Sequence, residues 1–146
     1  MRHNAYDAYV NNEILTAEPL ELVIMLYRGA LESIGRARAC VRGRDIAGRA
    51  AAINKTLAIV GELSSALDHQ RGGEISRNLA GIYNYVQRKL IDANVQQSEA
   101  PLAECEQLLS TMLGAWQSCC EQVHKETAAL TSAPAYAEAE RLALAY

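Results

Sequence analysis

Near its end the sequence carries residue types that bind metal ions. Cys120 and His124 are four residues apart, so a helix would place both side chains on one face. Glu121 and His124 have the Glu-x-x-His spacing of di-metal helix bundles, but such a site needs a second copy and two further inward carboxylates. The sequence holds no second copy, and a structural zinc site takes four ligands. We therefore expect no metal site and no cofactor.

Catalytic chemistry has equally little support. None of His3, His69 and His124 has a neighbouring serine or cysteine arranged as a nucleophile motif. The pair Gly72-Gly73 is too short for a phosphate-binding loop and indicates a turn. The four cysteines, including the adjacent pair at 119 and 120, lie in helical patterns without the spacing of a disulfide framework. We expect the protein not to be an enzyme.

Charge and hydropathy exclude several further classes. The formal net charge is −3 and the isoelectric point is about 5.6, which argues against a nucleic-acid surface. The first twenty residues contain no apolar core of a signal peptide, and nowhere do about eighteen apolar residues run together. We expect a cytosolic protein that does not insert into a membrane.

The elements that would position any site are helices. Half of the residues are hydrophobic, yet there is no Phe, and only 3 prolines and 9 glycines interrupt the chain. Four long helical segments emerge, separated by short breaks that force neighbours to run antiparallel. The sequence predicts an all-α, up-down-up-down four-helix bundle over residues 18–128, with helices at about 19–41, 45–71, 74–95 and 101–128. Residues 1–17 form a separate N-terminal segment, and 129–146 either form a short final helix or stay mobile.

Core positions follow from spacings of three and four residues. The clearest pattern is in the fourth segment, whose inward positions include Leu102, Leu109 and Trp116. The early stretch "LELVIMLY" is apolar nearly all round, which asks for cover on more than one side. The second segment is expected to face inward through Ile46, Ala50, Ile53, Leu57, Val60 and Leu67.

The helices carry more apolar surface than one core needs. In the third segment Tyr83 falls at the edge of the core stripe, whereas Tyr85 points to a flank. In the second segment a second apolar line is offset from the core positions and consists of Ala52, Ile59, Leu63 and Ala66. The sequence leaves three explanations open: a wide core stripe, cover by the terminal segments, or a groove for a partner helix.

Several stretches together resemble the FliS family of flagellin export chaperones, over about residues 4–125. They are "YDAYVNNEILTAEPLELVIMLYRGAL", "INKTLAIVGELSSALD", "NLAGIYNYVQRKLIDAN" and the lone tryptophan, Trp116. Glu18 departs from the resemblance, because a small capping serine is common there. The tail after Ala128 has no counterpart in the family.

The resemblance implies a cytosolic chaperone with an antiparallel four-helix bundle. Such a protein binds the disordered C-terminal segment of flagellin, prevents premature polymerisation and supports delivery to the flagellar type III export apparatus. The alternative is a regulatory adaptor whose main partner is another flagellar protein, such as an anti-sigma factor, a flagellin regulator or the export gate. A free protein with an open groove is also expected to be able to self-associate.

The resemblance and the surplus apolar surface together suggest where the client binds. The chaperone's N-terminal segment would move to make room, so its apolar residues are expected to be a displaceable cover: Tyr6, Tyr9 and Ile14. The groove itself is predicted to consist of residues from the second and third helices: Ile59, Leu63, Ala66, Leu79, Tyr83 and Tyr85.

Overall fold

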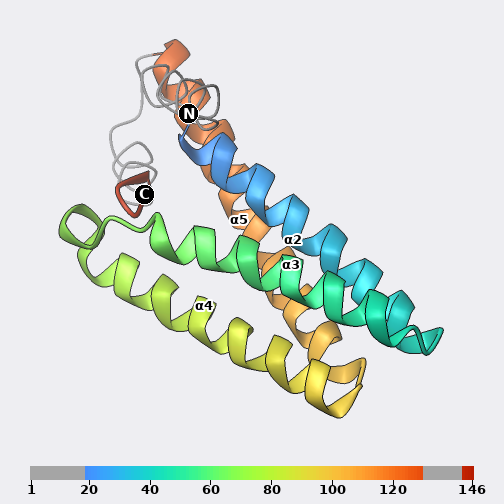
Figure 1. Ribbon diagram of the computed structural model, residues 1–146. Coiled ribbons are helices and arrows are strands. Elements are labelled where there is room, and N and C mark those ends of the chain that lie inside the picture. Colours follow the sequence, from blue (N-terminus) through green and yellow to red (C-terminus); the bar gives the residue numbers. More distant parts are fainter. Residues whose placement is uncertain (1–18, 130–142) are drawn as a thin grey trace, which may run out of the picture.

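The computed structural model describes residues 19–129 and 143–146, and the long stretch consists of four helices (Figure 1). Each helix packs against its neighbours in sequence, and the first also packs against the last. The described residues contain no strand, so the prediction of an all-α bundle is confirmed. The helices are α2 (Pro19–Arg42), α3 (Ile46–Ser65), α4 (His69–Gln96) and α5 (Ala100–Ala129).

Short polar caps hold the helix ends. The Asp45 carboxylate accepts a hydrogen bond from the Gly48 amide at 2.9 Å, as expected for the residue before α3. Between α4 and α5, Gln97 adopts the left-handed conformation that commonly ends a helix. Next to it, the Ser98 hydroxyl accepts a hydrogen bond from the Ala100 amide at 3.3 Å. These caps keep the connections short, which keeps successive helices antiparallel.

The break between the second and third helices does not lie where the sequence suggested. We expected the second helix to run up to Gly72-Gly73 and the third to begin at Glu74. Instead α3 ends at Ser65 and α4 begins at His69. Asp68 caps the new helix, because its carboxylate accepts a hydrogen bond from the Arg71 amide at 3.0 Å. The glycines do mark a change of direction, since Gly73 has φ 52° and ψ −120° inside α4.

The core face of α3 also differs from the predicted one. Ile46 is 60% exposed, because it is the first residue of the helix and lies at the end of the bundle. Ile53, Val60 and Leu67 are buried as expected, but Arg49, Thr56 and Leu63 are buried too, and none of these three was expected on the core face. Two of these are polar, which hid the true face from a search for apolar spacing.

Both buried polar side chains on α3 have partners. The Arg49 Nε donates to the Asn94 Oδ1 of α4 at 3.0 Å, and the Thr56 hydroxyl donates to the Ala52 carbonyl at 2.9 Å. Buried polar groups are tolerated when they are paired in this way. Asn94 belongs to the "LIDAN" stretch, so part of the motif that signals the family joins α3 to α4.

An aromatic cluster lies at the centre of the bundle. Tyr27 of α2 and Tyr83 of α4 are fully buried, and their hydroxyl oxygens lie 2.7 Å apart. Trp116 of α5 completes the group, with its ring centroid 6.4 Å from that of Tyr27. Burial raises the pKa of both tyrosines far above 10, so both stay neutral. Tyr83 therefore packs inside the bundle, as its position on the helix indicated.

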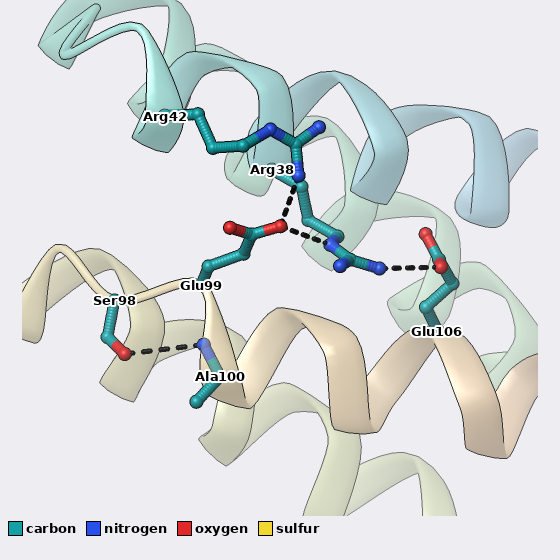
Figure 2. Close-up of polar contacts among 6 residues, drawn as sticks. All are labelled: Arg38, Arg42, Ser98, Glu99, Ala100 and Glu106. Carbon is teal, nitrogen blue, oxygen red and sulfur yellow. Dashed lines mark hydrogen bonds and ion pairs between the residues drawn. The ribbon is translucent and has the colours of Figure 1, made fainter.

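A cluster of charged residues, here called the clamp, joins the C-terminal end of α2 to the N-terminal end of α5 (Figure 2). Arg38 donates to the Glu99 carboxylate at 2.9 Å and to Glu106 at 2.8 Å, and Arg42 also bonds Glu99. The bond from Arg38, together with the charge of Arg42, holds the pKa of Glu99 below its ordinary value of 4.5. The clamp fixes the end of α2 against the start of α5.

Removing the Tyr83 hydroxyl tests the aromatic cluster. We expect Tyr83→Phe to lower the free energy of unfolding by about 1–3 kcal/mol, because it leaves the buried Tyr27 hydroxyl without its nearest tyrosine partner. Chemical denaturation would measure this loss. Tyr85→Phe is the matched control, since that ring is half-exposed, and equal losses in the two variants would contradict the arrangement.

The clamp makes stability depend on pH in a defined direction. Because the pKa of Glu99 is lowered on folding, its contribution is present above pH 4.5 and is lost as the pH falls through the folded-state pKa. We therefore expect Glu99→Gln to be less stable than the parent at pH 7, with the difference shrinking below pH 4.5. Thermal melts across this pH range would measure it, and a pH-independent difference would contradict the clamp.

Candidate partner-binding site

The predicted groove residues on α3 have three different environments. Ile59 is half-buried against α2, where its Cδ1 lies 3.5 Å from the position that a Cβ on Gly29 would take. Leu63 is fully buried in the core, whereas Ala66 is exposed just past the end of the helix. Of the three, only Ile59 and Ala66 reach the surface.

The residues on α4 separate in the same way. Leu79 and Tyr83 are buried in the core. Tyr85 is half-exposed and its hydroxyl donates a hydrogen bond to the Glu104 carboxylate of α5. Tyr85 therefore lies on the side of α4 that faces α5, as its offset from the core stripe allowed.

The surface around Tyr85 is polar as well as aromatic. The Lys89 ammonium lies 5.5 Å from the centre of the Tyr85 ring and 3.6 Å from a Glu104 oxygen. The hydrogen bond from Tyr85 lowers the pKa of the Glu104 carboxyl, and the Glu104 charge raises that of Lys89. This edge thus offers a partner an aromatic face beside a fixed pair of opposite charges.

The six predicted residues do not form one continuous surface. Ile59 faces α2 and Tyr85 faces α5, while three of the others belong to the core. A partner that contacted both exposed side chains would have to extend around the bundle. The expected cover residues, Tyr6, Tyr9 and Ile14, lie outside the described residues, so their role stays a prediction.

A cleft between α2 and α5 was not anticipated as a site. It has a volume of about 530 Å³, and Met25 on its edge is 53% exposed. The stretch "LELVIMLY" was the sequence signal for this cleft, since it is apolar nearly all round and the core buries only part of its apolar surface. The cleft is lined by Glu21, Ile24, Met25, Arg28, Gln117, Cys120, Glu121 and His124.

Three potential metal ligands meet at this cleft. Glu21 joins the Cys120 and His124 pair that the sequence suggested, and one ligand atom from each lies within 4.8 Å of the others. The Glu21 carboxylate and the His124 Nε2 are 3.7 Å apart, with both side chains about half exposed. These three ligands are fewer than the four of a structural zinc site. We interpret the group as a Glu21–His124 contact beside a cysteine, which becomes an ion pair when the imidazole is protonated.

The last four residues of the sequence also pack on the bundle, at the connection between α3 and α4 (Figure 1). Ala145 is fully buried, and its carbonyl accepts a hydrogen bond from the Asp68 amide at 2.9 Å. We expected residues 129–146 to form a short helix or to stay mobile. The described part, 143–146, instead forms a turn that is closed by a hydrogen bond from the Tyr146 amide to the Ala143 carbonyl. Sequence patterns gave no sign of this contact.

Comparison with known proteins identifies the family. The sequence model of the family described as flagellar protein FliS matches residues 2–123. The chain belongs to the FliS family. No helix within 19–129 combines the length and the apolar character that crossing a membrane requires.

Individual relatives agree over most of their length, and each is described as a flagellar secretion chaperone. The protein of Campylobacter jejuni is 35% identical over 118 residues, which is 80% of this chain and 92% of that protein. That of Salmonella typhimurium is 34% identical over 109 residues, covering 74% and 81%. That of Bacillus subtilis is 32% identical over 123 residues, covering 84% and 91%. This FliS family member thus has a chaperone role in flagellar export.

The ion-pair interpretation of the cleft predicts how the protein responds to metal removal. Treatment with a chelator should leave the melting temperature and the helix content unchanged, because the contact between Glu21 and His124 needs no metal to join α2 to α5. Calorimetric titration with zinc, using His124→Gln as the control variant, measures directly whether zinc binds in the cleft. Zinc binding that raises the melting temperature and is lost in this variant would overturn the interpretation.

Proposed function

We propose that this FliS family member binds the disordered C-terminal segment of flagellin in the cytosol. Held in this way, the segment cannot join a growing filament, and the complex supports delivery of flagellin to the flagellar type III export apparatus. The family match over residues 2–123 carries this proposal. No step of it requires a catalytic group or a cofactor.

The arrangement of the helices supports a client that wraps around the bundle. Ile59 and Tyr85 are both partly buried and pack toward different neighbouring helices, and Tyr85 offers apolar area beside the charged Glu104 and Lys89. A disordered chain that becomes helical on binding can reach both, and the apolar area that it buries offsets about 2–5 kcal/mol of ordering cost. Ala66, the C-cap residue of α3, adds a small exposed apolar group at the end of that helix.

Residues 1–17 complete the proposal. Tyr6, Tyr9 and Ile14 cover part of the surface of the free protein and leave it when the client binds. Without that cover, exposed apolar residues would favour self-association. The core residues of the predicted groove, Leu63, Leu79 and Tyr83, contribute by supporting the surface from below.

Titration with a client peptide tests this function. The peptide consists of about the last forty residues of flagellin from the same organism, which on this proposal order only when they bind. Calorimetry measures its affinity, and circular dichroism measures the helix that is gained. We expect one-to-one binding with a rise in helicity, weakened about tenfold or more by Tyr85→Ala or by Ile59→Asp.

The controls separate the function from the site. Val95→Ala changes a residue that is 77% exposed near the end of α4, and it should leave the affinity unchanged. Binding that ignores both site variants would keep the function and move the site elsewhere. Absence of binding at micromolar concentrations would contradict the function and favour another flagellar partner.

A further inference from the structure

The segment Ala143–Tyr146, here called the tail segment, occupies a defined seat on the bundle. Besides the Asp68 amide, the Ser76 hydroxyl donates to the Ala145 carbonyl, at 3.4 Å. Gly72 allows the close approach, since a Cβ there would come within 2.9 Å of the Ala145 Cα. The start of α4 therefore presents a polar amide, a hydroxyl and a gap for a small residue.

The second half of the seat is aromatic. The Tyr146 hydroxyl bonds that of Tyr83, and so extends the buried chain of hydroxyls that begins at Tyr27. The Tyr146 ring meets Trp116 edge to face, with centroids 5.6 Å apart and planes at 70°. These contacts place the tail segment between α4 and α5, where it covers two aromatic residues of the core.

The seat takes a recognisable kind of peptide. It accepts a small residue against Gly72, a backbone carbonyl between Asp68 and Ser76, and a large side chain beside Trp116. None of these features requires a covalent link to the bundle. A segment from another chain that offered the same groups would make the same contacts.

The position of the tail segment in the sequence suggests an exchangeable occupant. It is joined to α5 through residues 130–142, and the family match ends at residue 123. The tail segment has few hydrogen bonds, and its hold is strengthened by the high local concentration that a tether provides. A longer client that makes further contacts along the bundle can therefore displace it.

From these contacts we infer that the seat is a client-binding site, and that the tail segment fills it until an apolar stretch of the client takes its place. The inference rests on the proposed function, since the occupant is the flagellin segment. The tail segment thereby lowers the apparent affinity for the client, because only the fraction of molecules with an open seat binds fully.

The test compares the full chain with a variant that lacks residues 143–146. Both are titrated with the flagellin peptide by calorimetry, and their thermal melts are recorded. If the seat is open in about one molecule in ten, the deletion tightens binding about tenfold. Tyr146→Phe keeps the ring against Trp116 and loses the hydroxyl bond, so it should tighten binding less. Val95→Ala serves as the control, because Val95 lies at the far end of α4 from the seat.

Trp116 provides a direct signal, because it is the chain's single tryptophan and contacts Tyr146. In the full chain, client binding should change Trp116 emission, with Tyr146 replaced by client side chains. Equal client affinity for the full chain and the deletion variant would overturn the inference and leave the proposed function standing. Weaker binding by the deletion variant, with a lower melting temperature, would make the tail segment a fixed part of the bundle. Absence of binding by both would refute the proposed function and the inference with it.

Discussion

The hydrogen bond between the Tyr27 and Tyr83 hydroxyls is the contact around which the rest of the bundle is arranged. Two buried hydroxyls need partners, and each satisfies the other while their rings fill the space between α2 and α4. Trp116 packs on Tyr27 from α5. Three of the four helices therefore meet at one cluster, and the Tyr146 hydroxyl reaches the same cluster from the tail segment.

This central cluster separates residues that hold the bundle from residues that can meet a partner. Tyr83 and Leu79 of the "NLAGIYNYV" stretch are needed inside, whereas Tyr85, two positions from Tyr83, faces α5 and the solvent. The same separation occurs on α3, where Leu63 is in the core and Ile59 is at its edge. The buried residues form the frame of the bundle, and the outer helix faces are where we propose that the client binds.

The sequence was sufficient for the number and order of the helices, because their apolar spacing, the cap at Asp45 and the proline at the start of α2 are local signals. It misplaced the break between α3 and α4, because it took Gly72-Gly73 for the turn. It failed on α3, where Arg49 and Thr56 lie on the core face and obscure its spacing. It also placed Ile59 and Tyr85 in one groove, because a helical wheel gives the face of each helix but not which neighbour that face meets. The seat of Ala145 depends on contacts between distant parts of the chain, which no local pattern reveals.

Flagellin assembly in the presence of the protein tests whether the chain holds the C-terminal segment of flagellin and prevents polymerisation. Purified flagellin is induced to polymerise, and light scattering follows filament growth with increasing amounts of the full chain. We expect growth to stop near one chain per flagellin, because each client then has its C-terminal segment held on a bundle. Filament growth at an unchanged rate with an excess of the chain would contradict it.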